Sequence, residues 1–205
     1  WPRKYLIDID GFIVYDHIGE GAYEETERKI QELLSERIEV LGLKDGVTQD
    51  IAARTIPNQV NFDEVKSPEI YFGASRNDSL GNGVPEKTGT QSLTNPAKIE
   101  SNKLFLIGDW KFEDEYAVNE SSNAKIIFKY RAKNVYFVAS APQSIKVRVL
   151  MDGKLQESEG DLVQGYVYIK EDRLYHLVEG EEYNEHTLEL IIEKPGLKAF
   201  TFTFG

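Results

Sequence analysis

The spacing of apolar residues predicts two kinds of structure in this chain, and the first is a short hairpin followed by a helix. Two strand-like runs, residues 5–9 and 12–17, flank Asp10-Gly11, a dipeptide that favours a tight hairpin turn. From residue 22 to residue 41 the apolar positions follow a helical period. Glutamates crowd the first turns of this segment, where negative charge suits the helix dipole. The first 41 residues therefore predict strand, turn, strand and helix.

After residue 67 the pattern changes to repeated short strand-like runs, several with clear alternation of apolar and polar residues. In the final run, Phe200, Phe202 and Phe204 fall on one face, which predicts that they share the core. Turn residues such as Asp152-Gly153 separate the runs. Together they predict a mostly β fold, a jelly-roll β-sandwich. The predicted strands are residues 69–75, 104–112, 115–118, 125–131, 134–140, 146–151, 165–170, 173–178, 187–193 and 198–204.

We therefore divide the chain into residues 1–41, a connection over residues 42–66, and a sandwich domain over residues 67–205. The connection is polar and has no sustained period. Residues 76–103 are rich in Gly, Asn, Ser and Thr, and no strand is predicted there. This segment forms either part of a binding rim or a mobile loop. A strand-like run only four residues from Trp1 indicates a fragment of a larger fold.

Charge and residue content narrow the possible functions. The 205 residues carry a formal charge of −11 without any basic run, which argues against nucleic acid and anionic membrane surfaces as partners. Hydrophobic content of 40% suits a chain with a packed core. There is no cysteine, so these residues hold no disulfide, zinc thiolate or cysteine nucleophile. The three histidines are dispersed, and we expect no metal site and no cofactor.

The first 41 residues resemble the C-terminal third of a TlpA-like thioredoxin domain. The resemblance rests on the Trp1-Pro2 dipeptide, Tyr5-Leu6-Ile7-Asp8, the Asp10-Gly11 turn, Gly19-Glu20-Gly21 and an acidic amphipathic helix. In that family the proline matching Pro2 is cis and lies beside a Cys-x-x-Cys active site. The resemblance therefore implies that Trp1 and Pro2 support a redox site. It also implies that the cysteine pair precedes Trp1, so that this chain alone has no catalytic residue.

The remaining residues resemble the carbohydrate-binding-module-like domain that ends DipZ-type proteins. The segments that carry this resemblance are Ser67 to Gly73, Gly108-Asp109-Trp110, Arg173-Leu174-Tyr175 and the terminal Phe200 to Gly205. In such proteins a membrane-embedded electron-transfer unit, a TlpA-like thioredoxin domain and this sandwich follow one another. The order of the two resemblances along this chain is the same.

The resemblance implies the C-terminal portion of an extracytoplasmic thiol-disulfide oxidoreductase with an appended ligand-binding sandwich. Its partners would be protein thiols or disulfides and the membrane electron-transfer unit, which would also tether it, with a carbohydrate as a further ligand. Two alternatives remain open. One is a binding module for carbohydrate or protein without enzymatic activity. The other is a glycoside hydrolase, although no carboxylate pair is selected by its spacing.

Sugar binding by a sandwich requires aromatic faces and polar groups that fix hydroxyls. For the aromatic faces we predict Tyr71, Trp110 and Tyr175, with Tyr116, Tyr166 and Tyr168 as further candidates. The polar partners are predicted to be Arg76, Asp109 and Arg173. The opposing interpretation is that these aromatic residues are core. An acidic run around Asp109 to Glu115 would similarly be a calcium site or a solvated loop.

Overall fold

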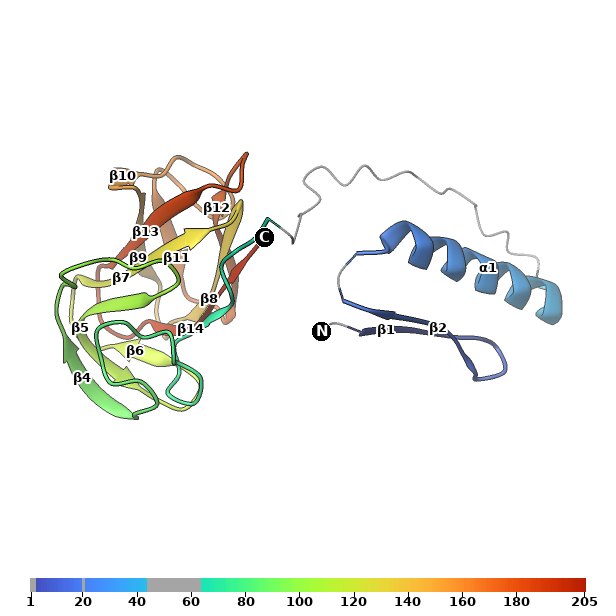
Figure 1. The fold of residues 1–205 in the computed structure, drawn as a ribbon, viewed down its shortest axis with the longest axis horizontal. Helices are drawn as coiled ribbons and strands as arrows, with labels where there is room; N and C mark the ends of the chain where they lie inside the picture. The colour runs from blue at the N-terminus through green and yellow to red at the C-terminus, as the bar shows by residue number, and fades with distance from the viewer. Residues whose placement is uncertain (1–2, 20, 44–63) are drawn as a thin grey trace. The chain divides into compact units, whose positions relative to one another are not determined.

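A computed structural model describes residues 3–19, 21–43 and 64–205 (Figure 1). The chain forms two compact units, Trp1–Gln59 and Val60–Gly205, which are described separately below. Trp1, Pro2 and most of the predicted connection, residues 42–66, lie outside the described residues. None of the described helices has the length and apolar character needed to cross a membrane.

The first unit is a hairpin of β1 (Arg3–Ile7) and β2 (Ile13–Ile18) followed by the helix α1 (Tyr23–Leu41), as the sequence predicts. The turn is fixed by Asp8, whose carboxylate accepts the backbone amides of Asp10 at 3.0 Å and Phe12 at 2.8 Å. Such side-chain bonds hold a turn without help from the rest of the fold. The helix ends at Gly42, whose left-handed conformation is typical of a helix C-terminus.

The first unit buries none of its apolar side chains, as judged from residues 3–19 and 21–43. Ile7 and Ile13 are each 61% exposed, and Phe12 is 68% exposed. Both strands thus present apolar side chains that have no core to enter. A hairpin of two strands gains little stability by itself in water, because it buries little surface.

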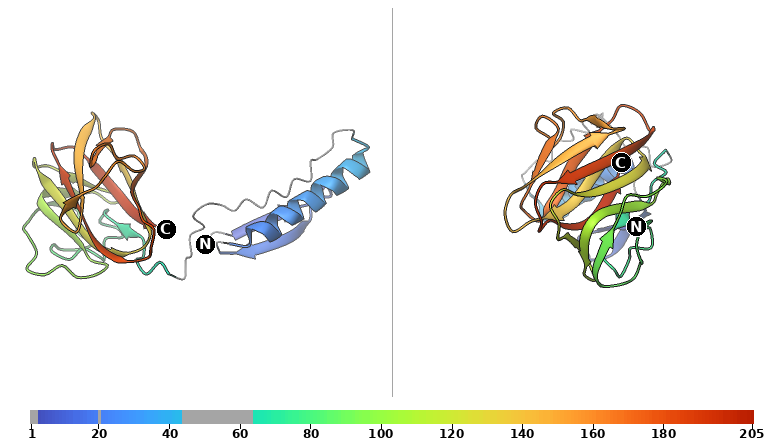
Figure 2. Two further views of the ribbon diagram at one scale, coloured as in Figure 1. Left: turned by 90° about the horizontal axis from the view of Figure 1, so that it is seen from above. Right: turned by 90° about the vertical axis from the view of Figure 1, so that its left-hand side faces the viewer.

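The second unit is an antiparallel β-sandwich, which confirms the predicted mostly β class. Every predicted run overlaps an observed strand. Figures 1 and 2 show these strands curling around a shared interior. The strands are β3 (Ile70–Tyr71), β4 (Gly89–Leu93), β5 (Leu104–Phe112), β6 (Ala117–Asn119), β7 (Ala124–Arg131), β8 (Asn134–Ser140), β9 (Ile145–Met151), β10 (Lys154–Leu155), β11 (Tyr166–Ile169), β12 (Arg173–Glu179), β13 (Glu185–Ile192) and β14 (Lys198–Phe204).

Strand β5 joins the two layers of the sandwich. Its first half, residues 104–107, pairs with β7 in the layer ordered β10-β9-β13-β7, where β11 also pairs with β9. Its second half, residues 108–112, pairs with β4, and β6, β14, β8 and β12 follow in the other layer. Gly108, with φ +100°, stands at the change of partner. A strand passes between layers by such a bend, and glycine permits this backbone conformation.

Three details of the sandwich differ from the sequence prediction, and the first is the two-residue strand β10, which no predicted run covers. Strand β4 lies inside residues 76–103, where no strand was predicted, because its polar run is an edge strand that needs few apolar residues. The prediction that all three terminal phenylalanines share the core is wrong for Phe200. A bulge between Ala199 and Thr201 shifts the register, so Ala199 and Phe202 are buried while Phe200 contacts Tyr116 instead.

Candidate functional site

Two of the predicted sugar-binding residues are buried in the core. Trp110 is 0% exposed and Tyr175 is 1% exposed. The indole N–H of Trp110 donates to the Ile107 carbonyl at 3.1 Å, which satisfies its one polar atom inside the protein. A sugar ring must reach the face of an aromatic side chain, so the prediction that these two residues form a binding platform is wrong. Their role in the described structure is packing.

Tyr71 and Arg76 form a separate pair at the strand β3. The Arg76 guanidinium lies over the Tyr71 ring, with its carbon 3.5 Å from the ring centre. The Tyr71 hydroxyl donates to Glu69, and this bond, together with burial, raises the pKa of Tyr71. One face of the ring is therefore covered by a cation within the protein. A ligand could reach this tyrosine only from its remaining surface.

Asp109 lies on β5, and its carboxylate accepts the hydroxyl of Ser92 on β4 at 2.6 Å. In the same stretch, Lys111 forms an ion pair with Glu113 at 2.6 Å. Neither feature brings several carboxylates together. The described residues contain no group of three or more His, Asp or Glu side chains placed to hold a metal ion.

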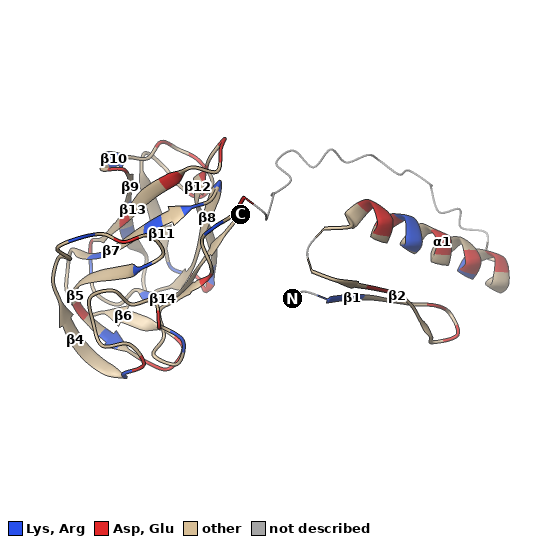
Figure 3. Cartoon of the chain, viewed as in Figure 1, with Lys and Arg blue, Asp and Glu red and all other residues tan. Residues whose placement is uncertain are grey.

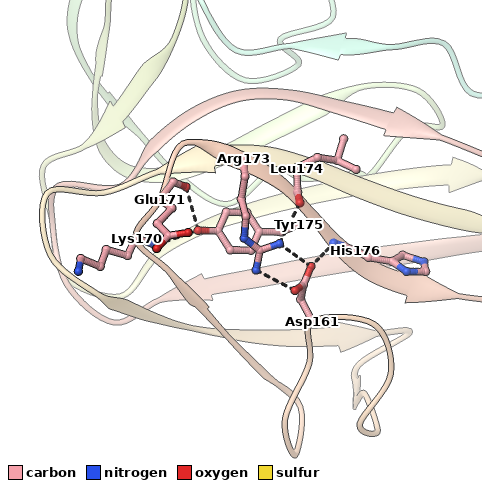
Figure 4. A network of polar contacts seen from close by, with 7 residues as sticks. All are labelled: Asp161, Lys170, Glu171, Arg173, Leu174, Tyr175 and His176. Carbon is pink, nitrogen blue, oxygen red and sulfur yellow. Dashed lines mark hydrogen bonds and ion pairs between the residues drawn. The ribbon is translucent and has the colours of Figure 1, made fainter.

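Arg173 belongs to a network of polar contacts on β12 (Figure 4). Its guanidinium donates to both carboxylate oxygens of Asp161, at 2.7 and 3.0 Å, and lies 3.9 Å from the centre of the Tyr175 ring. The Tyr175 hydroxyl donates to the Glu171 carbonyl at 2.9 Å and accepts the Lys170 amide at 3.0 Å. A tyrosine that fastens the chain a few residues upstream is a structural feature of β-sandwiches.

The structure does not bring the six predicted residues into one site. Asp109 lies on β5 and Arg173 on β12, and β6, β14 and β8 separate these strands in the layer. Four strand spacings correspond to roughly 19 Å. Tyr71 pairs with Thr201 of β14, between the two. The predicted residues therefore form three separate local contacts instead of a common ligand surface.

A cavity of about 510 Å³ at one end of the sandwich is a better candidate for a ligand site. Three loops surround it: the β7–β8 turn at Ala132 and Lys133, the β9–β10 hairpin with its continuation to Glu159, and the β12–β13 loop. Gly180 holds the β12–β13 loop in place by donating to the Lys133 carbonyl at 2.9 Å. Ligand sites of small molecules commonly have volumes of about 300–1,000 Å³.

The wall of this cavity includes a histidine oriented by an aspartate. His186 Nδ1 lies 2.7 Å from a carboxylate oxygen of Asp152, whose other oxygen accepts the Thr187 amide at 2.9 Å. Burial alone would raise the pKa of Asp152, but these hydrogen bonds lower it below its ordinary value. Because the carboxylate only accepts, Nδ1 is the donor in this contact.

The inner part of the cavity is less polar than its rim. Tyr130 and Val178 are buried, and the Tyr130 hydroxyl donates to the Met151 sulfur at 3.5 Å. Burial raises the pKa of Tyr130, so this phenol stays neutral. The mouth of the cavity is therefore polar, and Tyr130 and Val178 pack beneath it as part of the core.

Sequence reasoning missed this cavity because its lining comes from loops far apart in the chain. Tyr130 and His186 are 56 positions apart (186 − 130) yet lie with ring centres 6.1 Å apart. The sequence contains only weak indications of this cavity. Asp152 lies in a predicted turn, and Glu181-Glu182 lies between two predicted strands. Neither feature indicates which loops meet at the same end of a sandwich.

The fold and cavity define a two-unit protein in which an exposed hairpin and helix precede an antiparallel β-sandwich with a hollow at one end. The chain belongs to the thioredoxin-like C-terminal domain family, whose sequence model matches residues 67–205. It is also similar to protein DipZ of Mycobacterium bovis (strain ATCC BAA-935 / AF2122/97) and of Mycobacterium tuberculosis (strain CDC 1551 / Oshkosh). Each is 28% identical over all 205 residues. The chain spans only 27% of the length of these relatives.

Several solved structures share a distant likeness. A family two carbohydrate esterase from Clostridium thermocellum in complex with cellohexaose is 15% identical, with a TM-score of 0.40, over 47% of this chain and 29% of the other. A family two carbohydrate esterase from Cellvibrio japonicus is 10% identical, with a TM-score of 0.42, over 58% and 33% of the two chains. At these values the likeness carries no functional conclusion.

Proposed function

We propose that this chain is the C-terminal portion of an extracytoplasmic thiol-disulfide oxidoreductase of the DipZ type. The observation that supports the proposal is the similarity to DipZ proteins, which extends over both units and all 205 residues. The exposed apolar side chains of β1 and β2 agree with it. A hairpin at the edge of a thioredoxin-like sheet would be completed by further parts of that domain, which would bury these side chains.

In this proposal the first unit supports redox chemistry that other residues perform. The 205 residues contain no cysteine, so the reactive thiol pair of the parent protein lies outside them. Trp1 and Pro2 would lie beside that pair. A proline placed there leaves backbone groups free for an extended substrate, since proline has no N–H to give to a sheet. The partners would be protein thiols and disulfides, with electrons supplied by a membrane-embedded unit that also tethers the protein.

The test uses the natural gene. The residues encoded before Trp1 should include a Cys-x-x-Cys pair within roughly one domain length, about 100–150 residues. The protein containing that pair should reduce insulin disulfides in the presence of dithiothreitol, and a double Cys→Ser variant should not. A gene without such a pair, or a cysteine-containing protein with no more activity than the double variant, would overturn the proposal.

A second function, ligand binding by the sandwich, is favoured by the cavity beside His186. We propose that residues lining this cavity bind a small polar ligand such as a carbohydrate, independently of the redox unit. Calorimetry and a glycan array with the 205-residue chain test this proposal. Saturable binding that is lost in His186→Ala supports it. Silence across cell-wall and host glycans, or binding unaffected by His186→Ala, argues against it.

A further inference from the structure

We infer that a second site, on the outer face of the layer that contains β9, β11 and β13, binds an acidic sugar through its carboxylate. The site is a surface hollow of about 160 Å³, called the Tyr166 hollow below. It is separate from the cavity beside His186, because no residue lines both, and it does not depend on the function proposed for that cavity. The residues that line the Tyr166 hollow are Asn123, Lys146, Arg148, Tyr166, Ile191 and Glu193.

Three neighbouring strands position the side chains of this hollow. Tyr166 on β11 lies opposite Arg148 on β9, and Arg148 in turn lies opposite Ile191 on β13. The neighbours of Arg148 along its strand, Val147 and Val149, are buried in the core. Because successive side chains of a strand point to opposite faces, the row from Tyr166 to Ile191 lies on the outer face of the layer. Regular strands hold such a row more precisely than loops do.

Two cations of the hollow lie beside the same aromatic ring. The ammonium group of Lys146 lies 3.8 Å from the centre of the Tyr166 ring, and the guanidinium carbon of Arg148 lies 5.9 Å from it. The rings of Tyr71 and Tyr175, by comparison, each contact one arginine. Two like charges gathered at one ring repel each other, and an anion bound between them relieves this repulsion.

No carboxylate of the described residues neutralises the two cations. Glu193 lines the same hollow, and its backbone amide donates to the Lys146 carbonyl at 3.1 Å, so the two residues are cross-strand neighbours. Even so, neither Lys146 nor Arg148 forms an ion pair within the described part of the chain. In the same layer, Lys125 is paired with Glu189 at 2.7 Å. The ammonium group of Lys146 thus lies over the tyrosine ring rather than on the neighbouring carboxylate.

The charge of the hollow suits a ligand with a single negative charge. Lys146 and Arg148 supply two positive charges and Glu193 one negative charge, so the hollow is positive in a chain whose formal charge is −11. Figure 3 shows basic residues interspersed with acidic ones along the sandwich. A carboxylate carries one charge and forms strong hydrogen bonds with lysine and arginine. A phosphate monoester is largely dianionic at neutral pH and would bring a second negative charge beside Glu193.

The other groups of the hollow suit the hydroxyls and carbon skeleton of a sugar. The Glu193 carboxylate accepts hydrogen bonds from hydroxyls, and the Asn123 amide both donates and accepts them. Ile191 and the partly exposed Tyr166 ring provide apolar surface. The hollow is smaller than the about 300–1,000 Å³ of sites for larger ligands, so we expect one sugar residue to fill it. A uronic acid combines these groups in one residue.

The test compares glucuronate with probes that lack one of its parts. Glucose lacks the carboxylate, acetate lacks the ring, and inorganic phosphate carries more charge. Each is titrated by calorimetry into the 205-residue chain at pH 7. We expect glucuronate to bind at least tenfold more tightly than the other three, and this binding should weaken severalfold when NaCl is raised from about 0.05 M to about 0.5 M.

Two results of these titrations would overturn the inference. Acetate or phosphate binding as tightly as glucuronate would mean that the hollow attracts any counter-ion. A polyglutamate peptide that binds while glucuronate does not would assign the hollow to an acidic protein partner instead of a sugar.

Charge-neutralising variants locate the binding. Lys146→Gln and Arg148→Gln should each weaken glucuronate binding at least fivefold, because each removes one of the two cations. The matched control is Lys98→Gln, which removes an exposed lysine that does not line the hollow. An equal loss in Lys98→Gln would show that only the net charge of the chain matters. His186→Ala should leave glucuronate binding unchanged, and a loss there would place the sugar in the other cavity. Either result would overturn the inference.

Discussion

The carboxylate of Asp161 holds the guanidinium of Arg173 through two hydrogen bonds, 2.7 and 3.0 Å long. The same carboxylate accepts the backbone amide of His176 at 2.8 Å, and the Asp161 amide donates to the His176 carbonyl at 3.0 Å. A loop residue is thus fastened to β12, the last strand of its layer. Edge strands expose unpaired backbone groups, and this contact covers part of one.

We predict that this contact makes the stability of the sandwich depend on pH. The hydrogen bonds from Arg173, and then from the His176 amide, lower the pKa of Asp161 below its ordinary value of 3.8. A carboxyl with a lowered pKa stabilises the fold above its unfolded pKa, and this stability is lost as the pH falls through the folded pKa. Asp161→Asn should therefore cost about 1 kcal/mol at pH 7, and the difference from the wild type should vanish well below pH 4.

Urea denaturation of the two proteins between pH 7 and pH 2 measures this effect. The control is Asp78→Asn, because Asp78 is exposed and its carboxylate has no hydrogen bond among the described residues. Asp78→Asn should shift the unfolding free energy equally little at every pH. If the difference in unfolding free energy between wild type and Asp161→Asn stays constant down to pH 2, the Asp161 carboxylate is not the source of the pH dependence.

The hydroxyl of Tyr175 should matter for stability although its ring lies in the core. Tyr175→Phe removes the acceptor of the Lys170 amide and the donor to the Glu171 carbonyl. Losing a partly buried hydrogen bond of this kind costs about 0.5–1.5 kcal/mol, which corresponds to a fall in melting temperature of roughly 2–5 °C for a chain of this size. Thermal unfolding followed by circular dichroism checks the value.

Tyr168→Phe is the matched control for this substitution. Tyr168 is 53% exposed, and its hydroxyl has no hydrogen bond among the described residues. Its melting temperature should match that of the wild type within about 1 °C, because surface substitutions of this kind rarely exceed about 0.5 kcal/mol. Equal melting temperatures for the two variants would contradict the structural role assigned to Tyr175.

The pair Arg173 and Tyr175 also shows how far the sequence could lead. Residues two apart on a strand share a face, so their proximity was predictable from the alternation of side chains. Their structural role was not predictable, because Arg173 binds Asp161, which lies in a loop whose path no local pattern determines. The interpretation of Tyr175 as a ligand platform failed for this reason. An aromatic residue in a strand has the same sequence pattern whether it packs in the core or faces a ligand.

The terminal strand illustrates a second limit. Alternation predicted β14 correctly, but it assumes an unbroken period of two. The bulge between Ala199 and Thr201 inserts one residue and turns Phe200 away from Phe202. Long-range pairing with β8 sets this bulge. Patterns of single strands therefore gave the class of the fold, while the register, the cavity and the position of β4 depended on contacts between distant segments.

Gly108 should be intolerant of a side chain. A Cβ added there would lie 2.3 Å from the Ser121 hydroxyl oxygen, which now accepts the Asp109 amide at 3.0 Å. Gly108→Ala therefore combines the strain of a left-handed backbone, about 1–2 kcal/mol, with the loss of that hydrogen bond, about 0.5–1.5 kcal/mol. Denaturant unfolding should show a total loss of about 1.5–3.5 kcal/mol.

Gly89→Ala separates the two contributions. Gly89 has φ +97°, close to the value at Gly108, but a Cβ there would have no neighbour within 4 Å. This variant should lose only the backbone share, about 1–2 kcal/mol. If both substitutions cost the same, then the approach of Ser121 contributes nothing and the bend in β5 depends on backbone conformation alone.

The two units should differ in their ability to fold alone. The sandwich has its own core, in which residues such as Phe137 and Phe202 pack with ring centres 4.8 Å apart. We expect a fragment of residues 60–205 to unfold cooperatively at the melting temperature of the same transition in the full chain. A fragment of residues 1–59 should show no cooperative transition, because the described part of this unit buries only the side chain of Gln31.

Circular dichroism and amide NMR spectra of the two fragments check this expectation. A dispersed spectrum for residues 60–205 that superimposes on the corresponding peaks of the full chain supports an independent sandwich. A cooperative melt for residues 1–59 alone would contradict our interpretation of its exposed side chains. It would mean that Ile7, Phe12 and Ile13 need no further strands to cover them, which removes the structural reason for placing this hairpin at the edge of a larger sheet.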